Sequence, residues 1–203
     1  KKEGIFPGYT CGAVMQATAQ YVNNTFKIFY NTNGSTSGTP PDPTVAASGA
    51  AINLNDATGF SRTGFTFEGW SNGTAILAKG FATTMGSANA TLIAQWKVAE
   101  PVAPTISSVT GSDGGATITV APGSGGGAPS SYSVTAAPTG GSCTIVSPAT
   151  TCSISPLNNG TPYTFSVTAT NSTGTSSGTT SASVTPAGKP DAPTAVNAVA
   201  GNG

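Results

Sequence analysis

Two cysteines, Cys143 and Cys152, have the spacing in this chain that most clearly allows chemistry. Pro148 lies between them and marks a turn, so the two thiols can face each other across a hairpin. A disulfide there closes a small loop, and loop-entropy models give such a bridge roughly 2–3 kcal/mol. The alternative is a pair of buried free thiols. We favour the disulfide, on the expectation of an oxidising environment.

The third cysteine, Cys11, has no evident partner in the sequence. Its partner can lie upstream of Lys1, or on another molecule to which Cys11 is bonded. A free surface thiol and a buried thiol are the other two interpretations. Because the chain has three cysteines, no Cys-x-x-Cys pair and no histidine, we expect no structural zinc site. The sequence predicts neither a metal nor a cofactor.

Carboxylates are the remaining candidates for catalysis. Between residues 26 and 97 they are Asp42, Asp56 and Glu68, and a pair with one raised pKa could act as the acid and base of a glycosidase. Nothing in their spacing selects a pair, so solvated surface groups are the better interpretation. Histidine, the commonest general base, is absent from the chain. We therefore predict no catalytic activity for these residues.

Charge and hydropathy argue against two classes of partner. Lys+Arg and Asp+Glu number 7 each, and charged residues make up 7% of the 203 residues. No basic stripe is present to neutralise phosphates, so no nucleic-acid partner is expected. The glycine run at 125–127 is followed by no Lys-Ser/Thr and does not indicate a phosphate loop. No run of the roughly eighteen apolar residues that a membrane helix needs is present, so we expect no membrane span.

Short alternating apolar runs between turn signals predict a mainly β chain with room for about two domains. Such runs occur at residues 116–120, 131–135 and 163–169, and this pattern is typical of an all-β sandwich. Nearby, residues 157–163 read Leu-Asn-Asn-Gly-Thr-Pro-Tyr. This segment resembles the tyrosine corner of fibronectin type III domains, and the run that follows it resembles that family's F strand.

The fibronectin type III resemblance covers residues 103–186 and implies an immunoglobulin-like β-sandwich. The predicted core residues there are Tyr132, Leu157, Tyr163 and Phe165. One departure from the family concerns the B strand, which normally carries a core tryptophan. Ile118 and Val120 stand in its place, which puts detailed predictions of the core in doubt but not the fold.

Two aromatic-rich segments in the first half of the chain each close on a tryptophan. Residues 65–70 read Phe-Thr-Phe-Glu-Gly-Trp and residues 91–96 read Thr-Leu-Ile-Ala-Gln-Trp. Residues 26–97, which contain them, resemble the Listeria–Bacteroides repeat, the β-grasp B-repeat of internalin-type bacterial surface proteins. The predicted core residues are Phe26, Ile28, Tyr30, Phe65, Phe67, Trp70 and Trp96. A sugar-stacking platform is the alternative role, but a module of this size has few other large groups to bury.

The predicted order is that of beads on a string. Residues 1–25 form an N-terminal segment whose alternation favours a strand, with a helix as the alternative. The β-grasp module at 26–97 follows, and a short stiff linker at 98–102 connects it to the sandwich at 103–186. Residues 187–203 comprise a linker and the first strand of a further fibronectin type III module. The last assignment rests on a repeat, because residues 190–194 repeat the Pro-x-Ala-Pro-Thr pattern of residues 101–105.

These resemblances imply a non-catalytic stalk, spacer or adhesive surface of a bacterial protein that is extracellular or attached to the cell wall. One alternative is an accessory region of a secreted polysaccharide-degrading enzyme. Another is a self-assembling extracellular filament, in which residues 11–22 or 193–200 add a strand to a neighbouring subunit. The expected partners are a protein or a cell-wall or glycan surface, with self-association in the filament.

Overall fold

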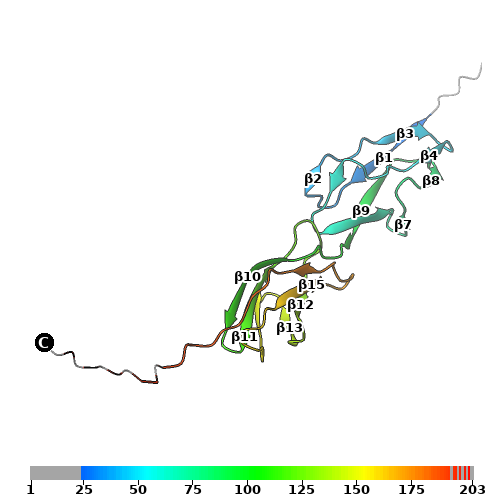
Figure 1. Cartoon of the computed structure of the whole chain (residues 1–203). Helices are drawn as coiled ribbons and strands as arrows, with labels where there is room; N and C mark the ends of the chain where they lie inside the picture. The colour runs from blue at the N-terminus through cyan, green and yellow to red at the C-terminus, as the bar shows by residue number, and fades with distance from the viewer. Residues whose placement is uncertain (1–23, 193, 196, 198, 200, 202–203) are drawn as a thin grey trace, which may run out of the picture.

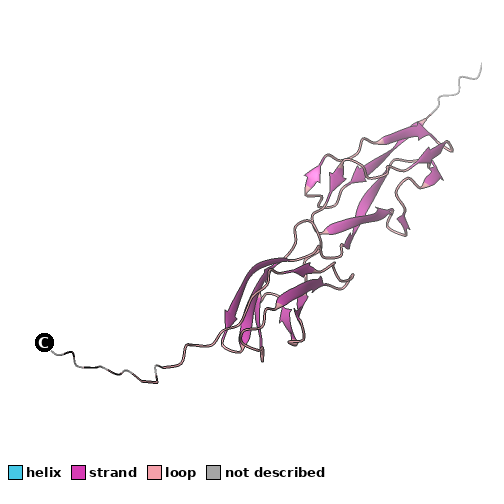
Figure 2. Ribbon diagram, viewed as in Figure 1, coloured by secondary structure: helices cyan, strands magenta, loops and turns pink. Residues whose placement is uncertain are grey.

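The computed structural model describes residues 24–192, 194–195, 197, 199 and 201. Within them every regular element is a β-strand, and the strands form two units placed end to end (Figure 1, Figure 2). The mainly β fold predicted from the alternating pattern is confirmed. The strand predicted at residues 11–22 and the Cys11 thiol lie outside the described residues. Of the strand predicted at 193–200, four residues are described, and none of these belongs to a strand.

The first unit is built on a five-stranded sheet in the order β3-β1-β9-β6-β7. Its strands are β1 (Thr25–Asn31), β3 (Thr44–Ala47), β6 (Phe65–Ser71), β7 (Ile76–Leu77) and β9 (Ala90–Val98). β1 and β9 run parallel, and the other pairs are antiparallel. Parallel neighbours need a long connection, and here the connection holds two short ribbons. These pair β2 (Ser37–Gly38) with β5 (Phe60–Ser61), and β4 (Ala51–Asn53) with β8 (Ala82–Thr84).

A cluster of aromatic rings fills the space between the sheet and the ribbons. Trp70 lies at its centre and is 0% exposed. The ring centroids of Tyr30, Phe67 and Phe60 lie 4.7, 5.1 and 5.8 Å from that of Trp70. Trp96 meets both phenylalanines edge to face, a geometry that aromatic pairs prefer. Large aromatic rings therefore make the contact between the ribbon that holds Phe60 and the sheet.

A β-bulge in β6 determines which of its aromatic side chains reach this cluster. Strict alternation would place Phe67 and Trp70 on opposite faces, because they are three positions apart. The pairing with β9 shifts register between Phe67 and Gly69, so one extra residue is accommodated and both rings face inward. Phe65, also predicted for the core, lies outside the core cluster and is half-buried. As the first residue of the strand it lies past the cluster, and the Arg62 guanidinium covers it at 4.1 Å from the ring centroid.

The second unit is a sandwich of two antiparallel sheets. The three-stranded sheet has the order β10-β11-β14, with β10 (Thr105–Ser112), β11 (Gly115–Ala121) and β14 (Thr151–Ile154). The four-stranded sheet has the order β13-β12-β15-β16, with β12 (Ser131–Ala137), β13 (Ser142–Val146), β15 (Thr164–Thr170) and β16 (Thr179–Thr180). Buried residues of both sheets alternate with exposed or half-buried ones, as the sequence pattern predicts.

Aliphatic side chains make up most of the sandwich core. Ile118 and Val120 are 0% and 2% exposed and fill the inward positions of β11. Tyr163 closes the core near the start of β15, where its hydroxyl accepts a hydrogen bond from the Asn158 N–H at 3.2 Å. Its own N–H donates to the Val184 carbonyl at 2.8 Å. The side chain therefore ties the preceding loop to the core, which is the role of a tyrosine corner, while the backbone of the same residue pairs with Val184.

Candidate functional site

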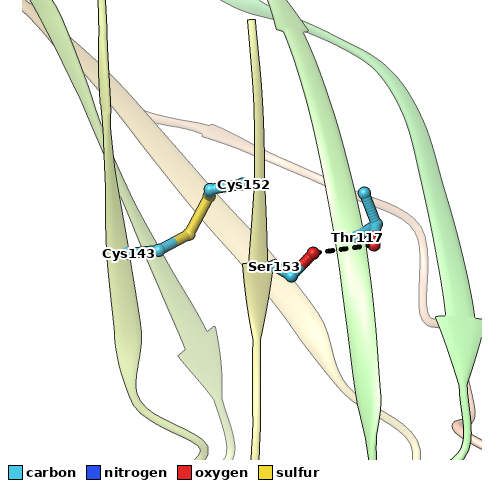
Figure 3. The surroundings of a disulfide bond; sticks show 4 residues. All are labelled: Thr117, Cys143, Cys152 and Ser153. Carbon is cyan, nitrogen blue, oxygen red and sulfur yellow. Dashed lines mark hydrogen bonds between the residues drawn. A yellow bond between two sulfur atoms is a disulfide. The ribbon is translucent and has the colours of Figure 1, made fainter. Parts of the chain in front are cut away.

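Cys143 and Cys152 form a disulfide between β13 and β14, with their Cα atoms 6.3 Å apart (Figure 3). The bond is confirmed, but the predicted hairpin is wrong. β13 pairs with β12, and β14 pairs with β11, so the two cysteines lie in different sheets. The segment between them crosses from one sheet to the other, and the bridge joins the two sheets along one side of the sandwich. Beside it, the Thr117 and Ser153 hydroxyls lie 2.9 Å apart and link β11 to β14 (Figure 3).

The other two edge strands, β10 and β16, border an open groove instead of a covalent bridge. Its lining consists of Thr105, Ile106, Ser108, Val109, Thr179, Thr180, Ser181, Ala182 and Val184. The Thr179 hydroxyl donates to the Pro104 carbonyl at 2.6 Å and holds the two edges together at one end. All of the lining side chains are apolar or hydroxylic, so the groove offers no charged group to a ligand.

The three carboxylates of the first unit lie at its surface. Asp42, Asp56 and Glu68 are all exposed. Hydrogen bonds from the N–H and then the hydroxyl of Thr58, at 3.0 and 2.8 Å, lower the pKa of Asp56. A general acid needs a raised pKa, so this shift runs in the opposite direction.

Among residues 24–192 and the described positions after them, no three His, Cys, Asp or Glu side chains gather into a possible metal site. Nor does the described part of the chain contain a helix that could cross a membrane.

The tryptophans use their polar atoms inside the first unit. Trp70 Nε1 donates to the Asn55 carbonyl at 2.8 Å, and Trp96 Nε1 donates to the Thr32 carbonyl at 3.1 Å. Because Trp70 is fully buried, it presents no face on which a sugar could stack.

The predicted core residues that are buried are Ile28, Tyr30, Trp70, Tyr132, Leu157, Tyr163 and Phe165, while Phe26, Phe67 and Trp96 are half-buried against the core. Burial also raises the pKa of the Tyr132 phenol.

A hollow lies where the two units meet. The first unit contributes Thr63, Gly64, Phe65 and Val98, and the second contributes Pro122, Gly123, Gly125, Gly126, Gly127, Ala128 and Pro129. The lining has no ionisable side chain, and glycine backbone makes up much of one wall. Sequence analysis did not predict this meeting of units, because the glycine run and residues 63–65 are far apart in the chain.

Comparison with known proteins addresses the second unit. Residues 100–186 match the family described as the fibronectin type III domain, and no curated protein matches the chain. The match spans both sheets of the sandwich, the disulfide between them and the corner at Tyr163. Residues 100–186 therefore form a fibronectin type III domain.

Proposed function

We propose that this chain is a non-catalytic spacer in a bacterial protein that is extracellular or attached to the cell wall. The observation that carries the proposal is the in-line arrangement of two all-β units, joined end to end (Figure 1). Fibronectin type III domains are generally non-catalytic modules, and the second unit is one of them. The disulfide is compatible with an oxidising compartment.

We propose further that the first unit is a β-grasp repeat of the Listeria–Bacteroides type. Two features support this assignment. The five-stranded sheet has a parallel pair, β1 and β9, between antiparallel neighbours. The tryptophans that end the two aromatic-rich segments, Trp70 and Trp96, belong to or pack against one core. In this proposal the aromatic rings stabilise the module and do not bind a ligand.

A replacement experiment tests the spacer role. In the full-length protein, residues 24–192 are replaced by two unrelated β-sandwich domains of similar combined length, and separately they are deleted. A spacer predicts that replacement preserves the exposure of the flanking regions at the cell surface, measured by antibody labelling, whereas deletion reduces it. Loss of adhesion in the replacement with normal labelling would instead show a specific adhesive surface. Retention of the purified chain on insoluble polysaccharide would favour an accessory module of a polysaccharide-degrading enzyme.

A further inference from the structure

The segment between the two units is bound along its backbone. On the first unit's side, the Ala99 N–H donates to the Gly64 carbonyl at 3.0 Å. On the second unit's side, the Gly127 N–H donates to the Glu100 carbonyl at 3.1 Å. Sequence analysis predicted a short stiff linker at residues 98–102. The structure adds hydrogen bonds to both units.

A turn after β15 supplies two more hydrogen bonds to the same backbone. Asn171 Nδ2 donates to the Ala99 carbonyl at 2.8 Å, and Thr173 Oγ1 donates to the Val98 carbonyl at 2.9 Å. Asn171 Oδ1 also accepts from the N–H groups of Thr173 and Gly174, at 2.8 and 3.2 Å. The turn therefore holds the Asn171 side chain in position. Together with Glu100, three successive carbonyls of the linker accept hydrogen bonds from the second unit.

Glycine is required on the opposite side of the linker. Gly127 is buried, and a Cβ atom there would collide with the Ala99 carbonyl oxygen. A Cβ atom on Gly126 would lie 2.5 Å from the Val102 nitrogen, closer than real Cβ contacts come. The glycine run thus lets its backbone touch the backbone of the linker. Any other residue at these positions would have to displace the linker.

We propose that residues 123–127 and 171–174 form a docking socket for the end of β9, and that this socket holds the two units as one rigid body. The partner that the socket fits is an extended strand end, because its contacts are made to backbone carbonyls and exclude side-chain bulk. This inference does not depend on the spacer role, since two accessory modules of an enzyme would be held in the same way.

Residual dipolar couplings of the oxidised chain test the proposal, because two rigidly joined units share one alignment tensor. Asn171→Asp keeps the oxygen that accepts the turn's N–H groups but replaces the donor to Ala99 by an acceptor. Gly127→Val displaces the linker sterically and serves as the second variant. Asn72→Asp is the matched control: Asn72 Oδ1 also accepts two turn N–H groups, from Thr74 and Ala75, both at 2.9 Å, in a turn remote from the linker.

The expected result is a common tensor in the parent chain and in Asn72→Asp. We expect that common tensor to be lost in Gly127→Val and weakened in Asn171→Asp, while the amide spectrum of each unit stays folded. Separate tensors in the parent chain would overturn the rigid junction. A common tensor that survives both junction substitutions would overturn the assignment of rigidity to this socket.

Discussion

The first unit packs its sheet with large aromatic rings, whereas the second unit uses aliphatic side chains and a covalent bridge. The first unit's sheet is covered by two ribbons whose strands are two or three residues long. The second unit has two full sheets, and branched aliphatic side chains fill the space between them. The comparison indicates that the kind of element packed on a sheet determines how large the side chains between them must be. A short ribbon leaves a gap that few but large groups must fill.

The largest effect should come from removing the central ring of the first unit. Trp70→Ala deletes a side chain that is 0% exposed. We expect a loss of about 3–5 kcal/mol in the first unit's free energy of unfolding. Denaturant unfolding, followed by the NMR signals of each unit, measures it. Phe29→Ala is the control, because Phe29 is 41% exposed. Equal losses in the two variants would contradict the aromatic core described for this unit.

Breaking the covalent bridge should affect the second unit alone. The double substitution Cys143→Ala and Cys152→Ala opens a loop with a sequence separation of 9, for which loop entropy predicts a loss of roughly 2–3 kcal/mol. Reducing agent should lower the stability of the parent by a similar amount and leave the double variant unchanged. If the first unit loses as much stability as the second, the separation of the two cores is wrong.

Tyr163→Phe should have a smaller effect on the second unit. The substitution removes the hydroxyl that accepts the Asn158 N–H, and the net value of one such hydrogen bond is about 0.5–1.5 kcal/mol. Tyr132→Phe is the matched control, because the Tyr132 hydroxyl makes no hydrogen bond to the residues that the structure describes. Thermal unfolding of both variants checks this difference. A larger loss in Tyr132→Phe would mean that the corner does not stabilise the sandwich.

The smallest effect should be a pH dependence confined to the first unit. Hydrogen bonds from Thr58 lower the pKa of Asp56 below its ordinary value of 3.8. A lowered folded-state pKa means that the contribution is present above pH 3.8 and is lost as the pH falls through the folded value. Asp56→Asn should flatten this part of the acid titration while leaving the second unit unaffected. An Asp56 carboxyl that titrates at its ordinary pKa in NMR would contradict the hydrogen bonds.

Alternation and turn signals are local properties, and they were sufficient to predict the mainly β fold. The corner at Tyr163 was expected from the resemblance of residues 157–163 to fibronectin type III domains. The cysteine spacing predicted the disulfide but not its location between sheets, because a hairpin and a crossing between sheets need similar chain lengths. The bulge beside Gly69 was not predicted, since it arises from pairing with a distant strand. Phe60 was missed as a core residue because it lies in a two-residue strand with no alternation around it.

The glycine run shows a different limit of sequence analysis. The lack of a following Lys-Ser/Thr argued against a phosphate loop, but the sequence did not identify what the glycine run contacts. The contacts that require Gly126 and Gly127 come from the linker, some twenty-five residues earlier, and are formed only when the chain has folded. No local pattern carries that information.

The parallel pairing of β1 and β9 has a mechanical consequence. The described chain enters the first unit at the start of β1 and leaves it at the end of β9, and these strands are neighbours in register from Ile28 opposite Ala90 to Asn31 opposite Ile93. Tension along the chain pulls the start of one strand and the end of the other in opposite directions. The two strands are then loaded in shear, so that the hydrogen bonds between them resist together and do not open one after another, as they would in a hairpin pulled from its open end.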